Sequence, residues 1–200
     1  MRAALALSAL LLAAALPAAA QGVPEKLLKG CADCHGMNGV AVKPDVPHVD
    51  AQKPQYLVDS MRAFVNGSRK TAVAEHASLT DEQATALATH YSAQPVARPK
   101  GQADAALFAA GETVYHNRCA DCHFENGRAA DKDAPLMAAQ NLNYLLAQTL
   151  AFRKGTRKFP FMMDDAYRGL SDADLTAVVH FFHGQDPALP PETGKRRRRR

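Results

Sequence analysis

The peptide Cys31-Ala-Asp-Cys-His35 recurs unchanged as Cys119-Ala-Asp-Cys-His123, and the two copies contain all four cysteines of the 200-residue chain. A Cys-x-x-Cys-His run is the attachment site of a c-type haem, in which two thiols bond to the porphyrin and the histidine supplies one axial iron ligand. The pattern predicts two covalent haem c groups, with His35 and His123 as proximal ligands. The attachment thiols would be Cys31, Cys34, Cys119 and Cys122.

The same cysteines allow three other interpretations. Two C-x-x-C pairs can hold one structural zinc, a single pair is typical of a redox dithiol, and a disulfide within each pair would suit an exported protein. None of these explains why a histidine follows both pairs. Haem is therefore the interpretation that uses every residue of the motif.

A repeat with an offset of 88 residues, the distance from Cys31 to Cys119, continues far beyond the motif. The second half gains three residues before the final match. The repeated segments are Asn38-Gly39 and Asn126-Gly127, Pro47 and Pro135, Ala51-Gln52 and Ala139-Gln140, Tyr56-Leu57 and Tyr144-Leu145, Phe64 and Phe152, Arg69-Lys70 and Arg157-Lys158, and Leu79 and Leu170. Two long copies, each with its own cofactor motif, indicate two homologous domains.

The chain divides into five expected segments. They are a signal peptide at 1–20, a first haem domain at 21–96, a linker at 97–102, a second haem domain at 103–190 and a basic tail at 191–200. Arg2, the apolar run from Ala3 to Leu16 and the small residues before Gln21 are typical of a secretory signal, with an uncleaved anchor as the alternative. Pro95, Pro99 and Gly101 favour an extended linker.

The charge of the chain depends on its tail. Without Arg2 and the six basic residues from Lys195 to Arg200, the 24 basic residues fall to 17 against 20 acidic ones, a net charge of −3. Such a tail is usually solvated, although it would also suit an acidic partner, anionic lipid or nucleic acid. The body has no basic stripe with interleaved aromatics, so we expect no nucleic-acid partner. Membrane contact is expected only peripherally or through an uncleaved signal.

Helical patterns account for the whole body of the chain. Short helices should run from Glu25 into Cys31 and from Ala105 to Asn117. Apolar spacing predicts helices at 53–65 and 141–154, each followed by a glycine. The last helix of each half begins with a capping pattern, at Thr80 and at Ser171. No alternating strand pattern competes, so the predicted fold class is all-α.

Four patterns each occur twice: Cys-x-x-Cys-His, a Pro followed by Gln-x-x-x-Tyr-Leu, Gly-x-Arg, and a final helix that begins with Leu-[Ser/Thr]-Asp. With these patterns the chain resembles the dihaem cytochrome c4 family and the related dihaem subunit of flavocytochrome c sulfide dehydrogenase. The resemblance implies two tandem class I cytochrome c domains about a pseudo-two-fold axis. It also implies that the carbonyls of Pro47 and Pro135 accept the proximal imidazole N–H groups. A plain loop turn is the alternative for both prolines.

The resemblance further implies a distal methionine about seven residues before Leu170. Met163 fits that position, and neighbouring Met162 is the alternative ligand. A thioether is a soft donor that favours ferrous iron and raises the potential.

The first half has no methionine at this position. Its loop is shorter and places His76 opposite Met163, so we expect bis-histidine ligation and a lower potential for the first haem. Met61 on a helix face and an open or water-bound iron are the alternatives. Met37 is too close to Cys34 to cross easily to the distal side, and His48 is expected at the haem edge. His90 is expected to be solvent-facing or satisfied, and His116, His180 and His183 are assigned no iron.

Arg69 and Arg157 follow the repeated glycines and are candidates for contacts with haem propionates, since guanidinium groups bind carboxylates in bidentate fashion. Surface salt bridges are the alternative role for both.

Two unequal haems predict an exported, periplasmic electron carrier rather than an enzyme. Its expected partners are redox proteins: a dehydrogenase or quinol-oxidising complex as donor, and a terminal oxidase or reductase as acceptor. The alternatives are the cytochrome subunit of a sulfur-compound dehydrogenase, or a small haem enzyme if the first iron is open. The oligomeric state is not indicated by the sequence.

Overall fold

The computed structural model describes residues 22–131, 134–160 and 163–188, so the expected signal peptide and basic tail lie outside the described residues. Its helices follow the repeat in the sequence. The first half contains α1 (Glu25–His35), α2 (Pro54–Val65), the short 3-10 helix η2 (Ala74–Ala77) and α3 (Asp81–Ser92). The second half contains α4 (Ala105–Arg118), the 3-10 helix η3 (Glu125–Gly127), α5 (Leu142–Arg153), α6 (Met163–Tyr167) and α7 (Asp172–His183).

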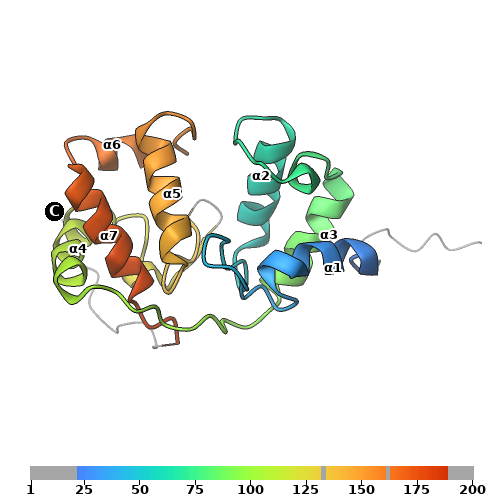
Figure 1. The fold of residues 1–200 in the computed structure, drawn as a ribbon, viewed down its shortest axis with the longest axis horizontal. Helices are drawn as coiled ribbons and strands as arrows, with labels where there is room; N and C mark the ends of the chain where they lie inside the picture. Colours follow the sequence, from blue (N-terminus) through green and yellow to red (C-terminus); the bar gives the residue numbers. More distant parts are fainter. Residues whose placement is uncertain (1–21, 132–133, 161–162, 189–200) are drawn as a thin grey trace, which may run out of the picture.

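The two halves lie side by side, and the segment between α3 and α4 passes along one edge of the molecule (Figure 1). Helices α2 and α5 occupy corresponding inner positions in the two halves. Within the described residues there is one isolated bridge, between Arg69 and Arg157, and no strand. These arginines occupy the same position of the repeat, so the bridge lies where a two-fold axis would relate the halves. The all-α, two-domain fold is confirmed.

Both final helices begin with the expected reciprocal caps. The Thr80 hydroxyl accepts from the Gln83 N–H while the Gln83 side chain accepts from the Thr80 N–H. Ser171 and Asp174 form the same pair of bonds at the start of α7. These bonds satisfy amide groups that the first helical turn leaves unpaired.

Each half has its own small apolar core. The first is built on Leu57, Leu87, Ala88 and Tyr91, and the second on Tyr115, Leu145, Val178, Val179, Phe181 and Phe182. In the second half α4 crosses closely over α7, because Gly111 has no side chain. A Cβ at Gly111 would lie 2.0 Å from the Ala177 carbonyl oxygen. Gly111 therefore sets how closely these helices pack.

The segment between the halves is anchored by a buried ion pair. Arg98 Nη2 lies 2.7 Å from Asp50 Oδ1, and neither side chain is exposed to solvent. The Asp50 carboxylate also accepts from the Ala97 N–H at 3.0 Å, and Arg98 Nη1 donates to the Leu136 carbonyl at 3.3 Å. Arg98 thus ties the connecting segment to both halves at once.

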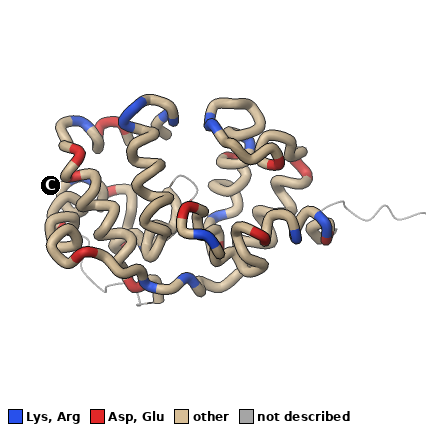
Figure 2. The backbone as a smooth tube through the Cα atoms, in the orientation of Figure 1, with Lys and Arg blue, Asp and Glu red and all other residues tan. Residues whose placement is uncertain are grey.

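Charged residues are spread over both halves, with Lys and Arg gathered on the loops that follow α2 and α5 (Figure 2). Among the described residues, no helix has the length and apolar character needed to cross a membrane.

Substitution of Gly111 by alanine should lower the free energy of unfolding by about 1–3 kcal/mol, because the added methyl group meets backbone rather than a movable side chain. Gly30→Ala is the matched control: a Cβ at that helical position meets nothing within 4 Å, so stability should rise by about 0.5–1 kcal/mol. Denaturant unfolding of the haem-loaded protein measures both. Equal effects would contradict the close helix crossing.

Arg98→Met should lower the free energy of unfolding by about 3–5 kcal/mol, because it leaves the Asp50 carboxylate buried without its partner. The double variant with Asp50→Asn should recover much of the loss. Arg62→Met, which breaks the exposed pair of Arg62 Nε and Asp81 Oδ1 at 2.8 Å, should change little. Guanidinium denaturation curves test the difference, and a mild effect of Arg98→Met would show that water reaches Asp50.

Candidate functional site

The first Cys-x-x-Cys-His motif lies at the carboxyl end of α1. Cys31 and Cys34 are one helical turn apart and lie on the same side of the helix. Neither forms a disulfide. Burial raises the pKa of the Cys31 thiol, whereas the reactive thiol of a redox dithiol has a lowered pKa.

The His35 imidazole is fixed by the loop that follows α1. Its Nδ1 lies 3.0 Å from the carbonyl oxygen of Pro47, so Nδ1–H donates and Nε2 remains free for a metal. Burial lowers the pKa of His35, although the bond to Pro47 opposes this effect. A neutral imidazole held in one tautomer is the form that binds iron.

His76 faces His35 from η2. The centroids of the two imidazole rings are 6.1 Å apart, and the His76 ring stacks on Phe64 at 5.0 Å. Its Nδ1 lies 3.2 Å from the Thr71 hydroxyl oxygen, which leaves Nε2 free. Burial, followed by the charge of Arg69, lowers the pKa of His76.

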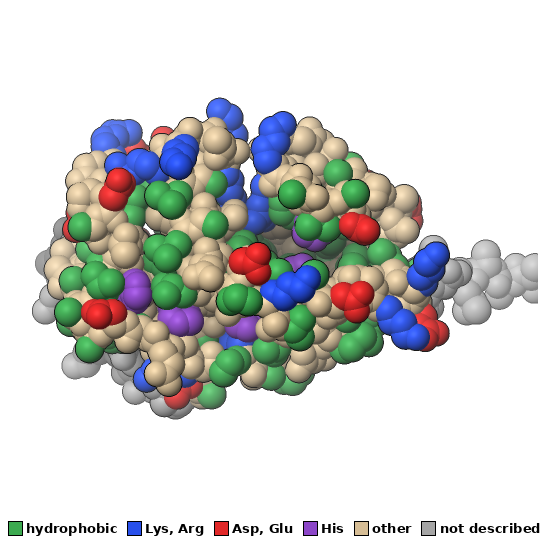
Figure 3. Space-filling view, in the orientation of Figure 1, with side chains coloured by type: hydrophobic (Ala, Val, Ile, Leu, Met, Phe, Trp, Pro, Cys, Tyr) green, Lys and Arg blue, Asp and Glu red, His purple; other side chains and the backbone are tan. Residues whose placement is uncertain are grey.

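The spacing of these rings fits one iron bound between them. Two metal–imidazole bonds of about 2 Å, each with a ring centroid roughly 1 Å beyond the nitrogen, place the centroids about 6 Å apart. The observed separation is 6.1 Å. The surface of the first half is hollowed, with histidine side chains in the wall (Figure 3).

The other ligand candidates of the first half have different surroundings. Met61 packs against the apolar core, and the Met37 side chain is 54% exposed. His90 Nε2 lies 2.8 Å from the Met37 carbonyl oxygen. His48 is buried, its Nδ1 accepts from the Ala41 N–H at 2.9 Å, and burial with the charge of Arg98 lowers its pKa to about 4.

The second motif begins just after α4. The Cys119 and His123 amides continue the helical bonding, with His123 N donating to the Cys119 carbonyl at 2.9 Å. Burial raises the pKa of Cys119 to about 11. The Tyr115 hydroxyl donates to the His123 carbonyl at 2.8 Å and so fixes the end of the motif against the core.

The expected bond from His123 to Pro135 is not formed. His123 Nδ1 is buried and has no hydrogen-bond partner, and burial lowers the pKa of its ring. The contacts of this structure therefore do not support the predicted role of the Pro135 carbonyl. In the first half the buried hydroxyl of Tyr91 is likewise without a partner. His123 and Tyr91, which lies near Cys31, are thus buried polar side chains with an unpaired atom. Both would fit the lining of a porphyrin site.

Met163 is the first residue of α6, and its amide donates to the Pro160 carbonyl at 3.2 Å. The alternative ligand Met162 lies outside the described residues. An aromatic cluster of Phe152, Phe159 and Tyr167 flanks the loop on both sides. The cluster thus joins the residues on either side of Met163 to Phe152 of α5, and the role of Met163 as the distal ligand stays a prediction.

Arg69 and Arg157 lie together at the boundary between the halves. Their guanidinium groups stack on the rings of Phe64 and Phe152, each at 4.4 Å from the centroid. Both donate to the Gln148 side chain, at 3.0 and 2.6 Å, and Arg69 also donates to the Tyr144 hydroxyl at 2.9 Å. Neither forms an ion pair with a described carboxylate, so propionate contacts remain a proposal for both.

The remaining histidines have structural contacts. His116 packs edge-on against Tyr115, His180 Nδ1 accepts from the Asp104 N–H at 3.3 Å, and His183 Nδ1 lies 2.9 Å from the Gln140 carbonyl. Within the described residues no group of three or more His, Cys, Asp or Glu side chains is arranged to hold a metal ion directly, as a zinc site would require. None of the four cysteines forms a disulfide, so the interpretation of a disulfide within each pair is not supported.

Comparison with known proteins identifies the family. The cytochrome c family model matches residues 108–185. Cytochrome c4 of Thiocapsa roseopersicina is 30% identical over 168 residues, which cover 77% of this chain and 86% of that protein. The chain belongs to the dihaem cytochrome c4 family. Reduced recombinant cytochrome c4 from Pseudomonas stutzeri matches the fold with a TM-score of 0.68 and 26% identity, over 83% of this chain and 100% of that one.

A second kind of relative is the thiosulfate dehydrogenase electron acceptor of Thiomonas intermedia. It is 29% identical over 178 residues, which cover 82% of this chain and 81% of that protein. Like other members of the cytochrome c4 family, this chain carries two covalently bound haem c groups and is a dihaem electron-transfer cytochrome.

Sequence reasoning missed the residues at the boundary between the domains. Tyr144 and Gln148 hold both arginines, and Gln52 and Gln140 each bind backbone groups of the opposite half. The only hint in the sequence was that Ala-Gln recurs after Pro47 and after Pro135, as Ala51-Gln52 and Ala139-Gln140. The sequence alone did not indicate that they cross the boundary.

His76→Ala should convert the first haem to a high-spin form that binds carbon monoxide, because it removes the imidazole opposite His35. His90→Ala is the matched control, since His90 contacts only backbone at its ring nitrogen, and it should keep the low-spin spectrum. In the unmodified ferric protein, the near-infrared methionine-to-iron band should have half the intensity expected for two methionine-ligated haems. Full intensity, or a low-spin His76→Ala protein, would exclude His76 as the ligand.

Proposed function

We propose that this cytochrome is a periplasmic electron carrier between a donor dehydrogenase or quinol-oxidising complex and a terminal oxidase or reductase. Each haem, when bound, takes up and releases one electron at its iron. The observation that carries the proposal is the unequal pair of distal positions. His76 faces His35 in the first half, whereas Met163 occupies the matching loop of the second half.

These side chains give the carrier a direction. An imidazole from His76 stabilises ferric iron, and a thioether from Met163 stabilises ferrous iron, so the first half has the lower potential and the second half the higher. The bond from His35 to Pro47 adds to this difference, because it makes the imidazole a stronger donor. The donor therefore serves the first half, and the acceptor draws from the second.

Reception of electrons from a sulfur-compound dehydrogenase is the second candidate function. It is favoured by the similarity to the thiosulfate dehydrogenase electron acceptor of Thiomonas intermedia. The chain has no cysteine besides the four of the haem motifs, so it offers no further thiolate for a sulfur substrate. In this alternative the chain still carries electrons, and a separate protein performs the oxidation of sulfur.

Export follows from the amino-terminal sequence and from the chemistry of attachment. Residues 1–20 have the pattern of a secretory signal, and the haem thioether bonds of bacterial cytochromes c form outside the cytoplasm, as the family resemblance implies. Both points support the periplasm as the place where the carrier works.

The haem-loaded protein alone should turn over neither thiosulfate, sulfide nor hydrogen peroxide, because both irons have a full set of ligands. Stopped-flow mixing with a quinol-oxidising complex and quinol, or with a thiosulfate dehydrogenase and thiosulfate, should reduce it rapidly. The His76→Ala protein, with one iron open, is the positive control for peroxide turnover. Steady turnover of thiosulfate, sulfide or peroxide by the unmodified protein would contradict the carrier function. The donor that reduces the protein faster, the quinol-oxidising complex or the thiosulfate dehydrogenase, decides between the two candidate functions.

A further inference from the structure

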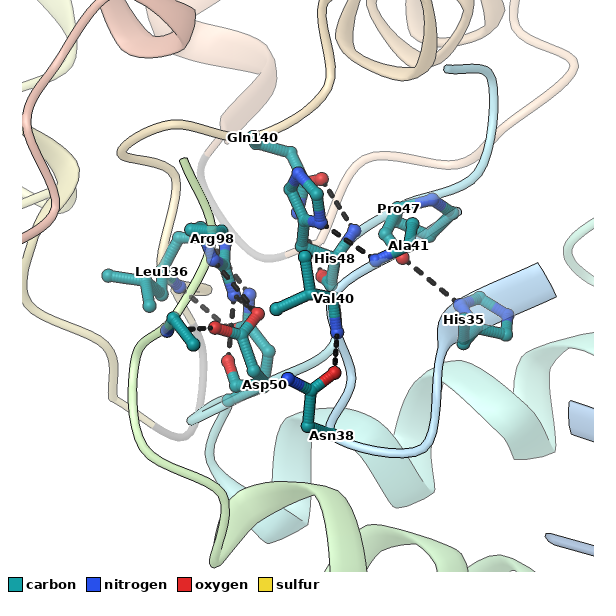
Figure 4. A network of polar contacts seen from close by, with 12 residues as sticks. His35, Asn38, Val40, Ala41, Pro47, His48, Asp50, Arg98, Leu136 and Gln140 are labelled. Carbon is teal, nitrogen blue, oxygen red and sulfur yellow. Dashed lines mark hydrogen bonds and ion pairs between the residues drawn. The ribbon is translucent and has the colours of Figure 1, made fainter. Parts of the chain in front are cut away.

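One peptide group of the first half is hydrogen-bonded at both ends. The Pro47 carbonyl accepts from His35 Nδ1 at 3.0 Å, and the amide N–H of the same peptide, that of His48, donates to Gln140 Oε1 at 2.7 Å (Figure 4). His35 belongs to the first half and Gln140 to the second. The proximal imidazole is therefore linked to the opposite domain through one peptide plane.

Gln140 holds this backbone with both ends of its amide. Its Nε2 donates to the His48 carbonyl at 2.9 Å, and both bonds are buried. Next to it, Asn141 Nδ2 donates to the Val46 carbonyl at 2.6 Å and to the Lys43 carbonyl at 3.2 Å. The loop that presents the Pro47 carbonyl is thus fastened from the second domain.

The same contact occurs at the equivalent position on the other side. Gln52, which matches Gln140 in the repeat, accepts from the Leu136 N–H at 2.8 Å and donates to the Leu136 carbonyl at 2.9 Å. Leu136 matches His48 in the same register. The two glutamines thus form a reciprocal pair about the pseudo-two-fold axis.

The residues before the glutamines are strained in the same way in both halves. Ala51 and Ala139 each have φ of 54°, a left-handed conformation that alanine rarely adopts. Their amides donate to the carbonyls of Tyr91 and Phe182, at 3.1 and 2.9 Å. The strained turn aims each glutamine across the boundary, and such strain persists where the surroundings fix it.

We propose that Gln140 is a positioning residue for the first haem, so that the second domain sets the strength of the proximal His35 bond. Donation of the His48 N–H to Gln140 polarises the peptide and makes the Pro47 carbonyl a better acceptor. A better acceptor draws the Nδ1 proton and makes His35 a stronger donor, which lowers the potential of its haem. The inference rests on His35 as the proximal ligand and requires neither His76 nor any particular redox partner.

The test compares Gln140→Met with Gln52→Met in the haem-loaded protein. Both variants remove two buried interface bonds of the same chemistry, but only Gln140→Met removes the partner of the His48 N–H. The ferrous-to-ferric ratio of the first haem at fixed potential should rise about threefold to tenfold in Gln140→Met, a shift of at most about 59 mV for a one-electron couple. In Gln52→Met that haem should keep its potential.

Two measurements accompany the spectroelectrochemical titration. With ¹⁵N-labelled histidine, the His35 Nδ1 proton should shift upfield and exchange faster in Gln140→Met, and stay unchanged in Gln52→Met. Asn141→Ala loosens the same loop without touching the Pro47–His48 peptide, so it should produce a smaller shift in potential.

Equal shifts of the first haem in Gln140→Met, Gln52→Met and Asn141→Ala would overturn the proposal, because they would reflect general loosening of the interface. An unchanged potential and an unchanged His35 proton in Gln140→Met would overturn it as well. If Gln140→Met does not fold, Gln140→Asn, one methylene shorter, withdraws the same acceptor and is measured in its place. Failure of the carrier function would instead appear as substrate turnover by the unmodified protein, which none of these readouts measures.

Discussion

The reciprocal hydrogen bonds of Gln52 and Gln140 are the contacts on which the arrangement of the two domains depends. Each amide satisfies one N–H and one C=O of the opposite half, at His48 and at Leu136. These backbone groups are buried, and a buried polar group without a partner costs about 1–3 kcal/mol. The domains therefore pack in one register, because a displaced register would leave four such groups unpaired.

The buried pair of Asp50 and Arg98 strengthens that register from the connecting segment. Arg98 contacts the Asp50 carboxylate, the Asp50 carbonyl and the Leu136 carbonyl, so one side chain joins the first half, the connecting segment and the second half. Leu136 is held by Gln52 and by Arg98 at the same carbonyl. These buried polar groups are paired with one another, and such a satisfied network favours one specific arrangement of the domains.

A symmetric interface holds two asymmetric sites. The haem motifs recur in both halves, and equivalent residues make equivalent contacts for the glutamines and for the arginines that stack on Phe64 and Phe152. The distal loops differ, since the first presents His76 from a 3-10 helix and the second presents Met163 from α6. Duplication explains the shared frame, and the divergence of one loop is the feature on which the proposed direction of electron flow rests.

The sequence by itself determined the cofactor, the helices and the duplication, because each rests on local spacing. Thiols three residues apart lie on the same side of a helix, capping boxes span four residues, and a repeat can be read along the chain. The tertiary structure alone decided which side chains meet across the boundary. Gln140 and His48 are 92 residues apart, and Arg69 meets Gln148 over 79, so no local pattern could predict these contacts. Only the packing of two domains about a common axis brings such groups within hydrogen-bond distance, and it is this packing that links His35 to the opposite domain.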